Sequence, residues 1–403
     1  MKLPKGWKIK TVDDLFDVQL GKMLNEKAKE GDAHQPYLTN FNVQWSRFRL
    51  DKLNTMSFSL REREKFALKK GDLIVCEGGE VGRCAIWREE IKPCYFQKAL
   101  HRLRPKNAEI ASDYMLAFMR FIAGSKRLGD LTSQSSIAHL TRERFLTLEV
   151  LTPPLPEQNK IADILSTWDE ALEKLDALIA AKDRRKQALM QQLLTGKKRF
   201  PAFSKRAWKR VRMNELMERA FRPIEWSAEM SLSLISIRRR CGGLFRRPEL
   251  LGSEYKTQDL HDLKAGDFLV SKRQVAHGAW AMVTPEFEGG HVSKEYAIFT
   301  NTAPDKLHMP FFAWLAQTPR MIRLSRVAST GVHIEKLIFD PAVFLRESIR
   351  LPATLEEQQH IATILDAADQ ELTLLRKQRN ALDQQKRGLM QRLLTGKIRV
   401  KTT

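Results

Sequence analysis

The stretch EQNKIADILSTWDEALEKLDALIAAKDRRKQALMQQLLTGK, residues 157–197, decides how this chain is organised, because the chain contains it twice. The second copy, residues 357–397, reads EQQHIATILDAADQELTLLRKQRNALDQQKRGLMQRLLTGK and aligns with the first without a gap, 200 residues downstream. Of the 41 aligned positions, 20 are identical, most densely at the closing Leu-Leu-Thr-Gly-Lys. Self-similarity at one fixed spacing indicates tandem structural units. We therefore expect the chain of 403 residues to consist of two half-molecules.

Each copy predicts one long helix. Apolar residues recur at alternating steps of three and four, which is the 3.5-residue period of a coiled-coil seam. Neither copy contains an internal proline, and Gly196 and Gly396 stand where the end of a helix is expected. A helix of roughly 40 residues would span on the order of 60 Å at about 1.5 Å per residue. The predicted seam consists of Leu165, Trp168, Leu172, Leu175, Ile179, Leu189 and Leu193 in the first copy and Leu365, Leu372, Leu375, Leu382, Leu389 and Leu393 in the second.

Polar residues interrupt both seams, at Lys182 and Lys186 in the first copy and at Arg379 and Lys386 in the second. Such interruptions lower stability but can fix the register and the number of partners. Because two matched seams in one chain most simply pack on each other, we predict an antiparallel pair of helices. The alternative is that each helix packs separately on its own globular domain.

Outside the helices, the two halves share short segments in otherwise diverged surroundings. LKKGDLIV (Leu68–Val75) recurs as LKAGDFLV (Leu263–Val270), and Trp7 and Trp208 open the two halves. Like scaffolds with unlike loops are typical of two recognition surfaces with different targets. We predict an α+β chain with a pseudo-twofold internal repeat, in which two long antiparallel coiled-coil helices separate two β-rich α/β domains. The predicted boundaries are residues 1–155 for the first domain, 156–197 for the first helix, 198–355 for the second domain, and 356–403 for the second helix and C-terminal tail.

The charge of the chain points to a polyanionic partner. Lys and Arg number 69 against 48 Asp and Glu, a formal net charge of +21. Nucleic acid is the usual partner of so basic a protein, especially where basic residues cluster, as in Arg238–Arg240 and Lys272-Arg273. The alternative is an ordinary basic surface without a specific ligand.

Several classes of function are disfavoured by missing patterns. No run of eighteen apolar residues and no signal-peptide core occur, so we expect a soluble cytoplasmic protein with no membrane partner. Four cysteines without a CxxC pair argue against a disulfide framework or a zinc site. Nothing matches a nucleotide-binding P-loop, an HExxH zinc motif, or the cofactor and base-binding motifs of a methyltransferase. We therefore predict no catalytic residue, no metal site and no cofactor in this chain.

The conserved segments of the repeat resemble one protein family. PLPEQ (residues 154–158) with IADIL (161–165), and LEEQ (355–358) with IATIL (361–365), each precede a long helix that ends in LLTGK. This pattern, which covers essentially the whole chain, resembles the specificity subunit of Type I restriction–modification systems. The chain departs from the family pattern at Leu351–Thr354, which replaces the second PLP-type segment.

The resemblance implies a non-catalytic DNA reader. Each globular domain would be a target-recognition domain that reads one half of a bipartite, asymmetric target in double-stranded DNA. The helices would set the spacer between the halves and dock two methylation (M) subunits, which use S-adenosylmethionine to methylate adenine. Motor-endonuclease (R) subunits would join this core in the full complex.

Candidate DNA contacts follow from residue type and from position beside the shared strand segments. Lys and Arg suit phosphates, whereas Arg, Lys, Asn, Gln, Ser and Thr also read base edges. For any one of them, the alternative is a solvated surface residue. The candidates are Lys22, Tyr37, Asn40, Gln44, Arg47, Arg83, Gln97 and Lys98 in the first domain, and Ser236, Arg238, Arg239, Lys272, Arg273, Gln274, His277, Ser293 and Lys294 in the second.

Two other classes of function stay open at this point. One is a stand-alone DNA nuclease or methylase with an unrecognised site, which activity of the isolated chain with metal or methyl donor would reveal. The other is a coiled-coil scaffold that binds only protein, which would explain the helices but not the basic loops of the globular parts.

Overall fold

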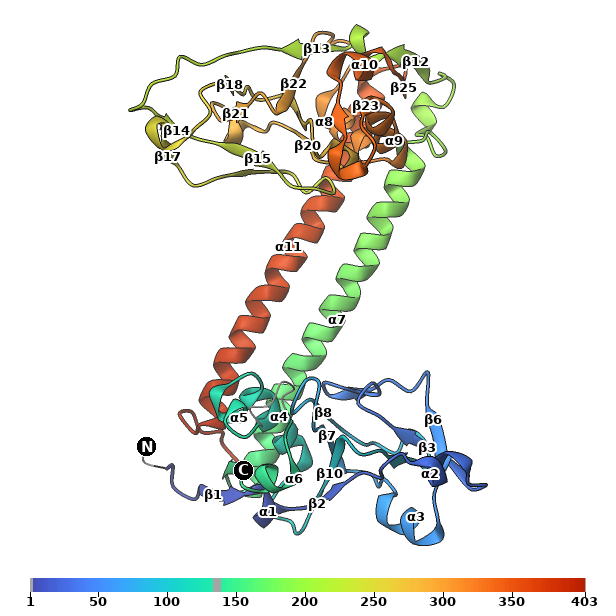
Figure 1. Cartoon of the computed structure of the whole chain (residues 1–403), viewed down its shortest axis with the longest axis vertical. Helices are drawn as coiled ribbons and strands as arrows, with labels where there is room; N and C mark the ends of the chain where they lie inside the picture. Colours follow the sequence, from blue (N-terminus) through green and yellow to red (C-terminus); the bar gives the residue numbers. More distant parts are fainter. Residues whose placement is uncertain (1–2, 133–138, 403) are drawn as a thin grey trace. The chain divides into compact units, whose positions relative to one another are not determined.

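The computed structural model describes residues 3–132 and 139–402, and the chain divides into two compact units. Unit 1 comprises Met1–Asp176 and Lys377–Thr403, and unit 2 comprises Ala177–Arg376. The borders fall inside the two long helices, α7 (Leu155–Leu193) and α11 (Leu355–Leu394). Each unit therefore holds one globular domain together with a part of both helices (Figure 1).

Unit 1 combines short strands with short helices. Its strands are β1 (Lys8–Thr11), β2 (Phe16–Leu20), β3 (His34–Leu38), β4 (Val43–Gln44), β5 (Arg47–Phe48), β6 (Asn54–Ser57), β7 (Leu73–Cys76), β8 (Cys84–Ile86), β9 (Tyr95–Phe96), β10 (Leu100–Pro105) and β11 (Glu149–Thr152). Its short helices are α1 (Val12–Leu15), α2 (Glu26–Glu30), α3 (Leu60–Phe66), α4 (Ser112–Ile122), α5 (Lys126–Gly129) and α6 (Arg142–Leu146). The central sheet is antiparallel in the order β2-β10-β7-β8, and a smaller sheet has the order β6-β3-β9.

Unit 2 is built in the same manner. Its strands are β12 (Lys209–Arg212), β13 (Met217–Ala220), β14 (Ser231–Leu232), β15 (Ile235–Ile237), β16 (Leu244–Arg246), β17 (Leu250–Leu251), β18 (Leu260–Asp262), β19 (Phe268–Ser271), β20 (Trp280–Met282), β21 (His291–Ser293), β22 (Tyr296–Asn301), β23 (Ser329–Thr330), β24 (Ile338–Phe339) and β25 (Ser348–Leu351). Its helices are α8 (Met309–Ala316), α9 (Pro319–Val327) and α10 (Pro341–Arg346), with short 3₁₀ turns that include η4 (Val275–His277) and η6 (Ile334–Lys336). The central sheet has the order β13-β22-β19-β20.

The Gly-Asp turns that the two halves share anchor the central sheet of each unit. In both, the glycine adopts a positive φ, 93° at Gly71 and 89° at Gly266, which favours a residue without a Cβ. The buried Asp72 accepts two hydrogen bonds of 2.7 Å from the guanidinium of Arg104 on β10. Asp267 accepts two of 2.7 Å from Arg222. A buried carboxylate needs such partners, so the motif is structural rather than DNA-reading.

The ends of the predicted seam belong to the domain cores. Leu165 and Leu393 are buried in the core of unit 1 with Phe118 of α4. Leu193 and Leu365 are buried in the core of unit 2 with Phe312 of α8. At these positions, therefore, the helices pack on the globular domains. Packing on the domains and packing of helix on helix, posed above as alternatives, occur at different places along α7 and α11.

Ion pairs join α7 and α11 within unit 2. Lys182 Nζ lies 2.5 Å from Glu371 Oε1, and Lys186 Nζ lies 2.6 Å from Asp369 Oδ1. Residue numbers rise along one helix as they fall along the other, so the two segments run antiparallel. The lysines that interrupt the first seam thus have partners on the opposite helix.

The same arrangement recurs in unit 1. Arg379 Nε lies 3.1 Å from Asp176 Oδ1, and the buried Lys386 pairs with Asp169. Asp169 also accepts the guanidinium of Arg120 from α4, at 2.7 Å. Because residues 169 and 186 of the first copy correspond to 369 and 386 of the second, the repeat forms one lysine–aspartate pair twice, once in each unit.

The Glu-Gln pair that opens each helix is buried and fully bonded. Glu357 accepts two hydrogen bonds from Arg199, of 2.9 and 2.8 Å, and one of 3.4 Å from Trp208 Nε1. Gln358 accepts from the backbone of His308 (2.9 Å) and donates to the carbonyl of Lys306 (2.8 Å). This glutamine thereby fixes the segment that leads into α8.

In unit 1, the equivalent glutamate ties the two ends of the chain together. Glu157 accepts hydrogen bonds of 2.6 and 2.7 Å from Arg399 and one of 3.1 Å from Trp7 Nε1. Arg399 also donates to the carbonyl of Lys5, at 3.0 Å. The C-terminal tail therefore lies beside the N-terminal segment, as Figure 1 shows near β1.

Candidate nucleic-acid interface

Two of the predicted DNA-contacting residues of unit 1 instead contact other residues of their own domain. Tyr37 is only 3% exposed, in a core with Phe58 and Phe96, so the prediction that it contacts DNA is wrong. Its place on β3, whose C-terminal residues are buried, explains why. Lys22 is half-buried, and its ammonium donates to Glu62 Oε2 and to the carbonyl of Ser57, both at 2.7 Å. Lys22 is therefore already engaged in holding these segments together.

Asn40 and Arg83 are brought together beside the loop between β7 and β8. Asn40 Nδ2 donates to the carbonyl of Gly78 (3.2 Å), and Arg83 Nη2 donates to the carbonyl of Asn40 (2.8 Å). Arg83 Nη1 also lies 3.2 Å from Glu80 Oε2. These bonds hold the half-buried Asn40 and Arg83 against the loop. Glu80 offsets the charge of Arg83.

The other unit 1 candidates lie nearer to solvent. The side chain of Arg47, on β5, is 72% exposed and lies 4.0 Å from Glu173. Gln44, on β4, is half-buried and donates to the carbonyl of Phe41 at 2.9 Å. Lys98 is exposed and Gln97 half-buried, and the latter forms a β-bridge with Lys22. Arg47 and Lys98 are the cations of this set best placed to meet a phosphate.

In unit 2, one group of candidates gathers around β19 and β21. Lys272 Nζ donates to the carbonyl of Lys294 at 2.6 Å, and burial lowers the pKa of Lys272. Arg273 pairs with Glu295 at 2.5 Å, and Lys294 Nζ lies 3.7 Å from a carboxylate oxygen of Asp259. Exposed pairs of this kind contribute little stability, so these cations remain available to another anion. Ser293, the last residue of β21, is half-buried in the same group.

A second group gathers at the turn between β15 and β16. Arg238 donates to the carbonyl of Leu244 (3.0 Å), and its guanidinium lies over the ring of Phe245. Arg239 Nε donates to Gln274 Oε1 at 3.0 Å, which brings the turn against η4, where His277 is the last residue. Ser236, on β15, is half-buried.

The prediction missed two arginines of this second group. Arg240 and Arg326 line, together with Arg239 and His277, a cavity of about 420 Å³. Arg240 could have been found, since it completes a run of three arginines. No sequence pattern marks Arg326, because it lies on α9 and is brought to the cavity only when the chain folds.

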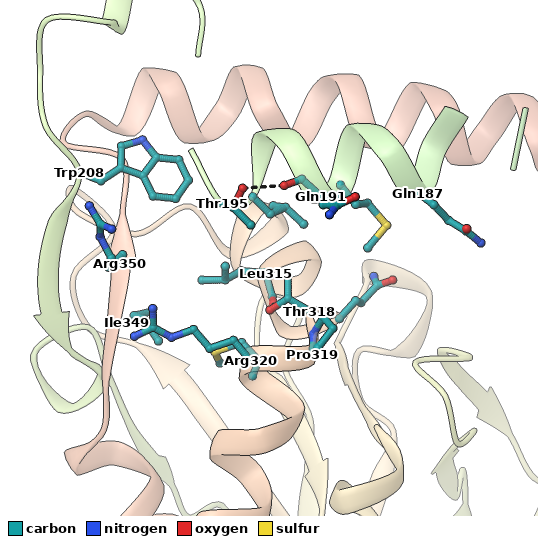
Figure 2. Close-up of a pocket in the computed structure, with 14 residues that line it drawn as sticks. Gln187, Gln191, Thr195, Trp208, Leu315, Thr318, Pro319, Arg320, Ile349 and Arg350 are labelled. Atoms are coloured by element: carbon teal, nitrogen blue, oxygen red, sulfur yellow. Dashed lines mark hydrogen bonds between the residues drawn. The ribbon is translucent and has the colours of Figure 1, made fainter. Parts of the chain in front are cut away.

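A larger cavity, of about 610 Å³, has a different character. Figure 2 shows Gln187 and Gln191 of α7, with Thr195 just beyond the end of that helix, on one side and Leu315 of α8 with the start of α9 on the other. Met190, Leu194, Trp208 and other apolar side chains dominate its lining, with Arg320 and Arg350 also present. Apolar walls do not suit a phosphate, so this cavity adds nothing to the basic surface.

Within residues 3–132 and 139–402, no group of three or more His, Cys, Asp or Glu is placed to hold a metal ion. Cys76, Cys84 and Cys94 are buried, and burial raises the pKa of Cys76 to about 11, which disfavours a reactive thiolate. Among the helices of these described residues, none is long and apolar enough to cross a membrane.

Comparison with known proteins agrees with this geometry. Residues 4–181 match the family described as "Type I restriction modification DNA specificity domain". The chain is 22% identical over 433 residues to the MjaVIII specificity subunit of a Type I restriction enzyme from Methanocaldococcus jannaschii, covering 100% of this chain and 95% of that protein. Its fold is similar to the crystal structure of a Type I restriction–modification S subunit from M. genitalium (TM-score 0.60, 15% identity, 98% of both chains). It is also similar to a chain solved for "complex assembly and conformational transition of the type I R-M system" (TM-score 0.59, 16% identity, 99% of this chain and 100% of that one). Residues 4–181 thus match the family of Type I DNA specificity domains, and the chain as a whole is similar to specificity subunits of Type I restriction enzymes.

Proposed function

We propose that this chain reads a bipartite, asymmetric target in double-stranded DNA, one half with the globular domain of each unit. The observation that carries the proposal is that two central sheets of the same strand order present unlike loops. The loop after β7, residues 77–83, reads EGGEVGR, whereas the corresponding loop after β19, residues 272–279, reads KRQVAHGA. Two glutamates in one loop and two basic residues in the other would favour different bases at the same position on the scaffold.

Within each half, cations would position the DNA and polar side chains would read it. Arg47 and Lys98 of unit 1, and Lys272, Arg273 and Lys294 of unit 2, suit backbone phosphates. Asn40, Gln44 and Gln97 of unit 1, and Ser236, Gln274 and Ser293 of unit 2, carry the donors and acceptors that base edges require.

The two helices would act as a ruler and as a docking platform. Helices of 39 and 40 residues, which span about 60 Å at 1.5 Å per residue, join both globular domains without interruption. Lysine–aspartate pairs at equivalent positions support an antiparallel coiled coil with pseudo-twofold symmetry. The domain boundaries would then lie close to residues 155, 197 and 355, near the ends of α7 and α11.

Catalysis would reside in other subunits. Two M subunits would dock on the helices and bring S-adenosylmethionine to adenines in the two half-sites, and R subunits would complete the restriction enzyme. The apolar cavity beside the C-terminal end of α7 would add to the surface available to an M subunit. This chain would itself hold no cofactor and catalyse no reaction.

The test is methylome sequencing of otherwise unmethylated cells that carry this chain with the M subunit encoded beside it. The matched control is cells that carry the M subunit alone. We expect a new bipartite motif with methyladenine in both halves. If the complex assembles and no new motif appears, the chain is not a DNA reader, and the protein-binding scaffold becomes the better account.

A further inference from the structure

We propose that the arginine-lined cavity of unit 2 binds one backbone phosphate of the target DNA, and that Glu335 occupies this anion site in the DNA-free chain. The inference rests on the proposed DNA-reading function and adds to it a defined phosphate site and a built-in competitor. Arg239, Arg240 and Arg326 supply the positive charge of the site, and His277 lines it beside them; we call it the unit 2 anion cavity.

The backbone that builds the cavity adopts an uncommon conformation. Arg240 and Cys241 have φ values of 58° and 54°, two consecutive non-glycine residues in the left-handed region. Their amides donate to the carbonyls of His277 (2.7 Å) and Gly278 (2.8 Å), which holds the β15–β16 turn against η4. Left-handed non-glycine residues persist only where their surroundings enforce them, and they concentrate at binding sites. The turn is therefore locked in the shape that brings Arg239 and Arg240 to the cavity.

Two of the guanidinium groups are held in place without losing their charge. Arg239 Nε donates to the neutral side chain of Gln274 at 3.0 Å. Arg326 donates from Nε and Nη2 to the carbonyl of Ala276, at 3.4 and 3.3 Å. Arg240 forms no ion pair within the described part of the chain. Forked guanidinium donors of this kind match the oxygens of a phosphate diester.

One carboxylate already bridges two of the four groups. Glu335 Oε2 lies 3.1 Å from Arg239 Nη2, and Glu335 Oε1 lies 3.0 Å from His277 Nε2. The second contact falls outside hydrogen-bond geometry, so the buried Nε2 atom of His277 lacks a hydrogen-bond partner among the described residues. Glu335 thus fills the anion position incompletely, with one good contact.

The bridge can be exchanged for DNA. The side chain of Glu335 is 59% exposed, on the short turn η6, and every residue from Thr330 to Lys336 is exposed. A pair so open to solvent is weak, whereas a phosphate brings its charge together with counterion release from the DNA. Three arginines against one carboxylate leave the cavity net positive even while Glu335 is in place. Binding of DNA would therefore displace Glu335 and place a phosphate between Arg239, Arg240 and Arg326.

The experiment measures DNA binding by the full chain in complex with its M subunit, on two duplexes. One carries the target identified by methylome sequencing, and the other carries the same bases in scrambled order. Affinity is measured over a series of salt concentrations for Glu335→Gln and Arg240→Ala. The matched controls are Glu288→Gln and Arg346→Ala, which change exposed residues of unit 2 that do not line the cavity.

We expect Glu335→Gln to bind the target about threefold to fivefold more tightly, because the competing carboxylate is gone. Arg240→Ala should bind more weakly and lower the slope of log K against log salt by about 0.9, the loss of one neutralised phosphate. Both controls should match the unmodified complex. If either variant matches its control while the complex still prefers the target to the scrambled duplex, the anion site is refuted and the DNA-reading function stands. If the unmodified complex shows no preference, the proposed function itself fails.

Discussion

At the scale of single residues, the contacts of buried polar groups explain why the Glu-Gln pair is identical in both copies of the repeat. Glu157 and Glu357 are both buried, and each accepts two hydrogen bonds from an arginine guanidinium and one from a tryptophan N–H. Removing one partner would leave a buried charge without its counterpart, which costs far more than losing a surface contact. The Glu-Gln pair that marks the family pattern in the sequence is thus a structural anchor, which holds the chain ends in unit 1 and an internal segment in unit 2.

A buried histidine makes the stability of unit 1 depend on pH. His101 is fully buried, its Nε2 lies 2.8 Å from the carbonyl of Leu140, and burial lowers its pKa below the ordinary value of 6.5. The unfolded chain therefore binds this proton at a higher pH than the folded chain does. Stability is full above the ordinary pKa and falls as the pH drops below about 6.5, by at most about 1.4 kcal/mol per pH unit from this group.

The prediction is checked by urea denaturation at pH 7.5 and pH 5.5. We expect His101→Gln to lose less unfolding free energy between the two conditions than the unmodified chain does. Substitution of the exposed His34 by Gln serves as the control and should leave the difference unchanged. Equal pH dependence of the His101→Gln variant and the unmodified chain would show that this histidine is not the titrating group.

At the scale of the elements, the equivalent lysine–aspartate pairs that join α7 and α11 differ in burial between the two units. The side chain of Lys386 is 4% exposed, and Arg120 of α4 lies 2.7 Å from the carboxylate of Asp169, with which Lys386 pairs. The equivalent Lys186 is 17% exposed and lies 5.4 Å from the ring of Trp314. Burial lowers the pKa of Lys386. The repeat therefore supplies an internal comparison between a buried and a more exposed ion pair.

We expect Asp169→Asn to reduce the unfolding free energy by about 3 kcal/mol, because it leaves the buried Lys386 unpaired. The matched change, Asp369→Asn, should cost only about 1 kcal/mol, since the ammonium of Lys186 is nearer to solvent. Urea denaturation of both variants measures the difference. Replacing Lys386 by Met in the Asp169→Asn background should restore most of the loss. Equal losses from the two aspartate variants would show that burial does not govern these pairs.

At the scale of the whole molecule, the proposed function predicts that the length of the two helices sets the length of the spacer in the DNA target. If α7 and α11 set the spacer, seven residues added to each helix should lengthen it. Seven residues keep the 3.5-residue seam in phase, and they add about 10 Å, or about three base pairs. Suitable positions are after Ile179 and after Arg376, which lie between the ion pairs Asp176–Arg379 and Lys182–Glu371.

Methylome sequencing checks this prediction. The expected target keeps both half-sites and gains about three base pairs between them, with weaker binding, because the added base pairs also turn the DNA by roughly 100°. A seven-residue insertion after the exposed Glu288, which leaves the helices unchanged, should keep the original spacer. A helix-insertion variant that methylates at the original spacing would refute the ruler.

Much of the scaffold was predictable because it depends on local patterns. The long helices follow from a seam repeated over many turns, and the Gly-Asp turns follow from a residue without a Cβ at a left-handed position. The contact residues were less predictable. Tyr37 is of a residue type that contacts DNA but is buried. Arg326 lines a cavity that no sequence pattern marks, and Glu335 contacts two residues of that lining.

By itself, the sequence determined the doubled organisation, the two long helices, the basic character and the family resemblance, since each arises from spacing or composition along the chain. Only the tertiary structure decided which side chains meet. Arg399 lies 242 residues from Glu157, and Glu335 lies 96 residues from Arg239, yet each pair is in contact. Such contacts depend on the path of the whole chain, because packing brings together residues that share no local hydrogen bond or period. The anion cavity is a product of that packing, and the repeat that organises the chain gives no sign of it.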